Sequence, residues 1–86
     1  MVDETTRPGD LTMAAVAEEV ARARAKFPNR RHLLAALVEE VGELAQAMLQ
    51  CKHPAEIQKE AIQVACVAIR IIEEGDEAFD DWSEPT

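Results

Sequence analysis

The stretch IQKEAIQVACVAIRII, residues 57–72, decides the fold because its apolar side chains fall on almost every side of a helix. An α-helix advances about 100° per residue, so these residues can be placed around the helix axis. One group forms an apolar face, and further apolar residues on both sides of it leave little of the circumference polar. A helix that is apolar almost all round is buried almost all round. Two other helices of the same chain cannot cover it completely, so the stretch predicts an obligate oligomer, a dimer built on this helix. The first face consists of Ile57, Ala61, Val64, Ala68 and Ile71.

Two further helical patterns precede this stretch, separated by the breaks FPNRR and CKHPAE. Asp10 and Asn29 are candidate N-caps for the first two helices. Pro54 suits the first turn of the third helix, and Gly75 suits its end. The sequence therefore predicts three helices, at about residues 11–26, 30–50 and 54–74.

These elements predict one all-α domain over residues 1–86, with a core at about 11–74. The C-terminal tail, residues 75–86, is acidic and carries two aromatic side chains, Phe79 and Trp82. A charge run of this kind is typical of a solvated tail. We expect the helices to form a bundle that oligomerisation completes.

Composition narrows the possible partners. The 86 residues carry a formal net charge of −8, which argues against a nucleic-acid duplex as partner and suits a protein that binds cations. No apolar run is long enough to cross a membrane, and the polar N-terminus is unlike a secretory signal. Cys51 and Cys66 have neither zinc nor redox spacing, so we expect free thiols in a reducing cytoplasm, with Cys66 in the core.

Carboxylates interrupt the second helix within LVEEVGELAQAML, residues 37–49. Glu40 and Glu43, three residues apart, share a face at the edge of the apolar stripe, and Glu39 lies further toward solvent. On the third helix Glu60 lies inside the apolar arc, and Gln63 follows three residues later. The stripe on the second helix consists of Leu33, Leu37, Val41, Leu44 and Met48.

Grouped carboxylates need a neutralising partner. Two of them about 5 Å apart repel by roughly 3 kcal/mol at an effective dielectric constant near 20. A divalent cation, a neighbouring Arg or Lys such as Arg70 or Lys59, or protonation would relieve this. A solvated surface is the ordinary explanation for a lone Glu-x-x-Glu, whereas Glu60 inside an apolar arc favours a cation. Oxygen-only ligands favour Mg²⁺ or Mn²⁺ over zinc.

The segments LLAALVEEVGELAQAML (33–49) and EIQKEAIQVACVAIRI (56–71) resemble the MazG-like all-α nucleoside triphosphate pyrophosphohydrolases. That family carries E-E-x-x-E on one helix and E-x-x-D on the next. The resemblance implies antiparallel helices that assemble as a homodimer or a dimer of dimers. It also implies Mg²⁺-dependent cleavage of a (d)NTP between the α- and β-phosphates, which gives the monophosphate and pyrophosphate.

Carried over by position, the resemblance implies metal ligands at Glu40, Glu43, Glu60 and Gln63. Glu39 and Glu40 are then the candidate catalytic residues, Glu39 holding a second ion or orienting the attacking water. Gln63 stands where the family has Asp. An amide oxygen coordinates Mg²⁺ without adding negative charge, so we expect weaker metal binding and low activity.

The tail lacks the basic and amide residues with which related proteins hold phosphates. Basic residues gather instead around the first break, and the phosphate-binding candidates are Lys26, Arg30, Arg31 and Arg70. Salt bridges to acidic residues of this or another subunit explain the same cluster equally well. Base stacking would fall to Phe27, Phe79 or Trp82.

Two functions follow from these patterns. The first is a Mg²⁺-dependent nucleotide pyrophosphohydrolase. The second, which Gln63 keeps open, is a non-catalytic helical oligomer of the same fold that binds a nucleotide or a protein partner. A plain helical interaction module explains less, because it gives no reason for a semi-buried Glu60. Gly42 is expected to leave room for a neighbouring helix or ligand.

Overall fold

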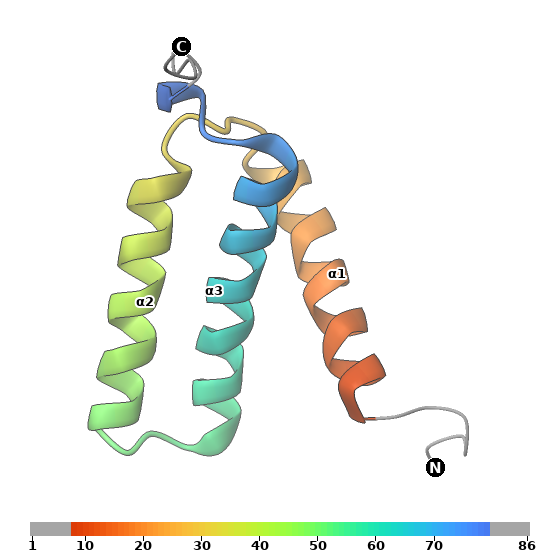
Figure 1. The fold of residues 1–86 in the computed structure, drawn as a ribbon. Coiled ribbons are helices and arrows are strands. Elements are labelled where there is room, and N and C mark those ends of the chain that lie inside the picture. Colours follow the sequence, from red (N-terminus) through yellow and green to blue (C-terminus); the bar gives the residue numbers. More distant parts are fainter. Residues whose placement is uncertain (1–7, 80–86) are drawn as a thin grey trace, which may run out of the picture.

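The computed structural model describes residues 8–79, and every regular element within them is helical. Figure 1 shows three helices, α1 (Pro8–Lys26), α2 (Leu33–Leu49) and α3 (Pro54–Glu74), followed by a short 3-10 turn at Glu77–Phe79. The all-α prediction is confirmed. Trp82 and the rest of the predicted tail beyond residue 79 lie outside the described residues.

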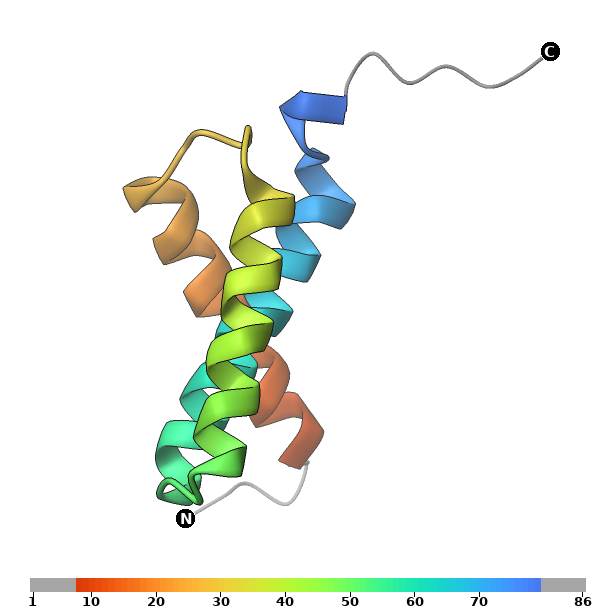
Figure 2. The same cartoon turned by 90° about the vertical axis from the view of Figure 1, so that its left-hand side faces the viewer.

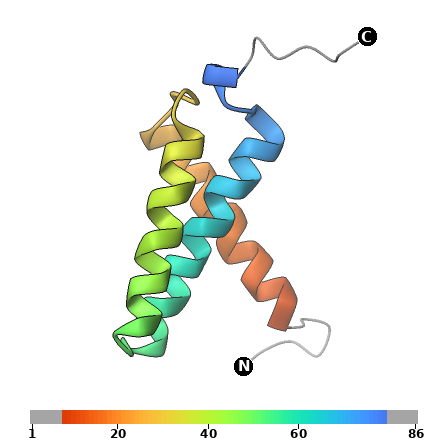
Figure 3. The ribbon, with the colours of Figure 1, turned by 60° about the vertical axis from the view of Figure 1, so that its left-hand side comes forward.

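The third helix, α3, lies between the other two. It contacts both α1 and α2, whereas no described residue of α1 comes within 8 Å of α2, Cα to Cα. Figures 1 and 2 show α2 and α3 side by side, joined by the short loop at residues 50–53. In Figure 3, α1 crosses α3 obliquely. The central position of α3 explains much of its apolar circumference without a second chain.

The core lies where α1 meets α3. Val16 and Val20 of α1 pack against Cys66 of α3, which is 1% exposed, as the sequence predicts. Burial raises the pKa of the Cys66 thiol, so this cysteine is an inert core residue. The surrounding half-buried apolar residues are Ala23, Ile62, Ala65 and Ile69.

Several apolar side chains expected in the interior lie at the surface. Ile72, on the predicted circumference of α3, is 81% exposed. On α2, Leu33 is buried, but Val41 and Met48 of the same predicted stripe are exposed, as are Leu34 and Val38. The largest uncovered apolar face within residues 8–79 therefore follows α2, whereas the sequence placed it on α3.

The helix starts differ from the predicted caps. Helix α1 begins at Pro8, so Asp10 lies in its first turn, where a carboxylate favours the helix dipole, and is not the N-cap. Helix α2 begins at Leu33, three residues after the predicted start. Asn29 does not cap α2, because its Oδ1 accepts a hydrogen bond from the Arg31 backbone N–H at 2.8 Å.

A distant residue caps α2 instead. The N-cap position, His32, makes no side-chain cap hydrogen bond. Asp76 Oδ2, 42 residues further along the chain, accepts from the Leu34 backbone N–H at 2.9 Å. The predictions for α3 are confirmed, because Pro54 opens it and Gly75, with φ of 70°, closes it. None of the described helices is both long and apolar enough to cross a membrane.

Candidate functional site

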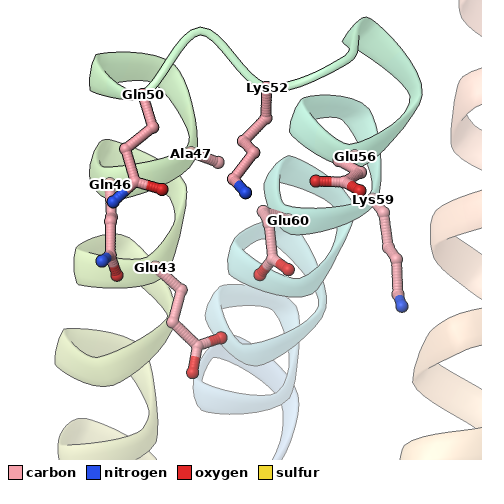
Figure 4. Close-up of a pocket in the computed structure, with 8 residues that line it drawn as sticks. All are labelled: Glu43, Gln46, Ala47, Gln50, Lys52, Glu56, Lys59 and Glu60. Carbon is pink, nitrogen blue, oxygen red and sulfur yellow. The ribbon is translucent and has the colours of Figure 1, made fainter.

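Three carboxylates meet where α2 faces α3. Glu40 and Glu43 lie one helical turn apart on α2, and Glu60 lies opposite them on α3. One oxygen from each lies within 4.8 Å of the others. The structure therefore brings together three of the four predicted metal ligands, and we call these residues the acid triad. Figure 4 shows Glu43 and Glu60 projecting into the space between the two helices.

Glu40 is the member of the acid triad with a buried oxygen that has no hydrogen-bond partner. Its Oε2 is buried and is the one buried side-chain oxygen or nitrogen of residues 9–79 without a hydrogen-bond partner. Burial raises the pKa of Glu40, and the charges of Glu43 and Glu60 raise it further. A buried acceptor without a partner costs about 1–3 kcal/mol. The oxygen-only donor set and the unsatisfied atom both fit a hard divalent cation such as Mg²⁺.

A large cavity opens on one side of the acid triad. Its volume is about 800 Å³, within the usual range for small-molecule sites. All three helices line it, so the site depends on the oblique position of α1. The cavity wall includes Glu19, Lys26, Phe27, Glu39, Glu40, Gln63, Cys66 and Arg70. Glu39 and Glu40, the predicted catalytic pair, therefore face the same cavity.

Gln63, the fourth predicted metal ligand, makes its side-chain hydrogen bond to α1 and not to the acid triad. Its Nε2 donates a hydrogen bond to Glu19 Oε1 of α1 at 2.8 Å. Arg22 holds the same carboxylate at 2.6 Å, and together these contacts lower the pKa of Glu19, with the Gln63 hydrogen bond as the largest cause. Sequence reasoning missed Glu19, because no spacing pattern links residues 44 positions apart on two helices.

Arg70 provides a fixed cation in the cavity wall. Its guanidinium is 4% exposed and donates two hydrogen bonds of 3.0 Å to Glu74, one to each carboxylate oxygen. Arg24 Nε donates to Glu74 as well, at 2.7 Å. Mainly through the Arg70 contact, the pKa of Glu74 falls to about 2. The guanidinium of Arg70 is therefore held in place before any ligand arrives.

The other basic candidates divide into two groups. Lys26 lines the large cavity, with its Nζ 5.4 Å from the centre of the Phe27 ring. Arg30 and Arg31 line neither cavity. Arg30 Nη1 donates to the Glu74 carbonyl oxygen at 2.9 Å, a favourable contact for a cation at a helix C-terminus. The structure therefore brings Lys26 and Arg70 to the site and gives Arg30 a structural contact.

A smaller pocket of about 280 Å³ lies on the other side of the acid triad, near the loop between α2 and α3. Glu43 and Glu60 line it together with Lys52 of the loop, and Figure 4 shows these side chains. The amides of Gln46 and Gln50 complete its α2 wall. No sequence pattern indicated this pocket, because its residues are adjacent only after the chain turns back.

No protein-family model matches the chain, and no curated protein and no solved structure matches it. The resemblance to the MazG-like family therefore rests on the residues of α2 and α3 alone.

Proposed function

We propose that this protein is a Mg²⁺-dependent nucleoside triphosphate pyrophosphohydrolase that converts a (d)NTP to the monophosphate and pyrophosphate. The observation that carries the proposal is the acid triad, whose three carboxylates converge within 4.8 Å around a buried, unsatisfied Glu40 oxygen. These carboxylates converge from two helices, and a divalent cation between them would neutralise their repulsion.

The residues of the site divide into roles. Glu40, Glu43 and Glu60 would hold Mg²⁺, or Mn²⁺ in its place. When bound, the ion would neutralise phosphate oxygens and lower the pKa of a water molecule. Glu39, an exposed carboxylate in the large cavity, would accept a hydrogen bond from that water and orient it. Gln63 adds no negative charge and points its amide to Glu19, so we expect metal binding to be weak and turnover low.

The large cavity suits the nucleoside. The exposed Phe27 ring offers a face on which a base can stack. The cations of Lys26 and Arg70 line the same cavity and can attract the α-phosphate, which is attached to the nucleoside. Of the three aromatic residues considered from sequence, Phe27 is the one that lines a cavity among the described residues.

We also propose that a second copy of the chain completes an antiparallel helical bundle, as a homodimer or a dimer of dimers. Five apolar residues are buried within the described part of the chain, which is a small core for 86 residues. The exposed apolar face of α2 is a surface for a partner, and the open space beside Gly42 lets another helix approach closely. Cys51 and Cys66 are free thiols, which fits a cytoplasmic location.

A non-catalytic helical oligomer that binds a nucleotide or a protein partner is the second candidate. The hydrogen bond from Gln63 Nε2 to Glu19 favours it, because it holds this side chain against α1, and an amide brings no negative charge to the metal site. Such a protein would bind nucleotide in the large cavity without turnover.

The test is an assay of pyrophosphate and monophosphate release from each NTP and dNTP with Mg²⁺ or Mn²⁺. We expect slow release that stops in EDTA and in Glu43→Gln. Nucleotide binding without release of either product would support the second candidate. If calorimetry detects binding of neither metal nor nucleotide, both candidates are wrong.

A further inference from the structure

The acid triad separates two cavities of different size and chemistry. Glu40 lines the large cavity of about 800 Å³, which also contains the Phe27 ring. Glu43 and Glu60 line the small pocket of about 280 Å³, whose walls are polar except for Ala47. Ligand pockets commonly measure about 300–1,000 Å³, so the large cavity has room for a nucleoside, whereas the small pocket lies just below this range.

The small pocket presents hydrogen-bond donors that are not engaged elsewhere. Figure 4 shows the Lys52 side chain extending from the loop into the space between α2 and α3. Its ammonium has no ion pair or side-chain hydrogen bond with any residue in the described range. Gln46 and Gln50 add amide N–H groups from α2. An ammonium and two amides are suitable donors for phosphate oxygens.

The charge of the small pocket depends on whether the acid triad holds a cation. Its lining includes three carboxylates, those of Glu43, Glu56 and Glu60, and two ammonium groups, those of Lys52 and Lys59. The formal balance is one negative charge, which repels an anion. A divalent cation on Glu43 and Glu60 would change that balance to one positive charge. Anion binding here should therefore require the metal.

We propose that the small pocket holds the pyrophosphate end of the substrate, with Lys52 as its principal ligand, while the large cavity holds the nucleoside. This inference rests on the proposed function. It places the bond between the α- and β-phosphates beside the acid triad, between the two cavities. Lys59 contributes less, because Figure 4 shows its side chain on the opposite side of α3 from Glu43.

During hydrolysis the acid triad would act on the attacking water, and the small pocket would act on the leaving pyrophosphate. The water oxygen bonds to the α-phosphorus, and one proton of the water passes to a carboxylate of the site. The carboxylate then releases this proton to the solvent. The bond from the α-phosphorus to the bridging oxygen breaks, and its electron pair leaves on that oxygen as part of pyrophosphate. Lys52, Gln46 and Gln50 donate hydrogen bonds to the leaving group, so the pocket stabilises the charge that develops there.

Calorimetric titration with inorganic pyrophosphate tests this assignment, with the same excess of Mg²⁺ in the cell and the syringe. We expect binding by the wild-type protein, and none when EDTA replaces Mg²⁺. Lys52→Ala should weaken the affinity about tenfold, the lower end for a lost hydrogen bond to a charged group. Lys26→Ala removes the same charge from the large cavity and should change pyrophosphate affinity less than twofold. Circular dichroism confirms that each variant is folded.

Each other outcome overturns the assignment in a distinguishable way. If Lys26→Ala weakens pyrophosphate binding and Lys52→Ala does not, the phosphates lie in the large cavity. If the wild-type protein binds Mg²⁺ but not pyrophosphate, the small pocket has another role, although the metal site stands. If it binds no Mg²⁺ in a separate titration, the proposed function fails together with this assignment.

Discussion

The two sides of α3 contrast in what they contact. Toward α1 the helix packs Cys66 against Val16 and Val20 in an apolar core. Toward α2 it presents Glu60 to two further carboxylates, one of which has a buried oxygen without a partner. The first contact stabilises the chain by itself, whereas the second is unfavourable until something neutralises it. Helix α3 thus has the stabilising apolar core on its α1 side and the candidate metal site on its α2 side.

The largest expected effect compares the same substitution on the two sides. Val20 is 5% exposed in the α1–α3 core, and Val38 is 65% exposed on α2. Val20→Ala should lower the free energy of unfolding by about 2 kcal/mol, through two lost methylene equivalents and a partly retained cavity. Val38→Ala should change it by less than about 0.5 kcal/mol. Urea denaturation measures both.

An equal cost for the two valines would contradict this contrast. It would mean that the outer face of α2 is covered in solution, as it would be in a dimer formed through α2. Sedimentation of the two variants at the same concentration distinguishes that case, because only Val38→Ala would then dissociate the oligomer.

A smaller effect is expected at Gln63, which connects α3 to α1. Gln63→Glu replaces the donor 2.8 Å from Glu19 with a second carboxylate. We expect a loss of about 1–2 kcal/mol, from the lost hydrogen bond and the like-charge contact. Combining it with Glu19→Gln reverses the donor and the acceptor and should recover most of the loss. A double-mutant cycle by thermal unfolding measures the coupling between the two residues.

The Gln63–Glu19 contact also changes the expectation for Gln63→Asp. The family motif favours Asp at this position, and a fourth acid should tighten metal binding. In this chain the side chain at position 63 lies beside Glu19, so the new carboxylate would be repelled by the Glu19 carboxylate. We therefore expect tighter Mg²⁺ binding only when Glu19→Gln is present as well, and tighter binding from Gln63→Asp alone would show that Glu19 is not held there in solution.

The smallest effect concerns the pH range above 4.5, in which Glu40 titrates while Glu74 stays ionised. Glu40 has a raised pKa in the folded chain, so its ionisation destabilises the fold at neutral pH, and this penalty disappears as the pH falls through that pKa. Glu74 has a pKa of about 2 against an ordinary value of 4.5, so its stabilisation is present above pH 4.5 and is lost as the pH falls toward 2. Without metal, the melting temperature should therefore fall at low pH as Glu74 is protonated, and fall again as the pH rises through the raised pKa of Glu40.

Glu40→Gln separates the two contributions. It should remove the decline above the pKa of Glu40 and leave the decline at low pH, which is due to Glu74, unchanged. Saturating Mg²⁺ should likewise remove the decline in the wild-type protein. A lower melting temperature for Glu40→Gln at pH 7 without metal would show that the acid triad is already neutralised by other means.

Local patterns predicted local structure well and distant contacts poorly. The bounds of α3 were predictable because Pro54 and Gly75 lie at its ends and act through their own backbones. Glu40, Glu43 and Glu60 could be grouped because helical spacing places them on known faces. The start of α2 and the partner of Gln63 depend on Asp76 and Glu19, which are over 40 residues away in sequence. A single sequence contains no signal for contacts of that kind.

The hydrogen bond from the Leu34 amide to Asp76 also sets an order of events during protein synthesis. The chain leaves the ribosome from its N-terminus, so α2 is complete before its capping residue has been made. The amide at the start of α2 must stay bonded to water until α3 has formed and residue 76 has emerged. A chain interrupted before that point would have α2 without its cap, which costs about 1 kcal/mol. The first turn of α2 should therefore be among the last parts of the chain to become protected from hydrogen exchange.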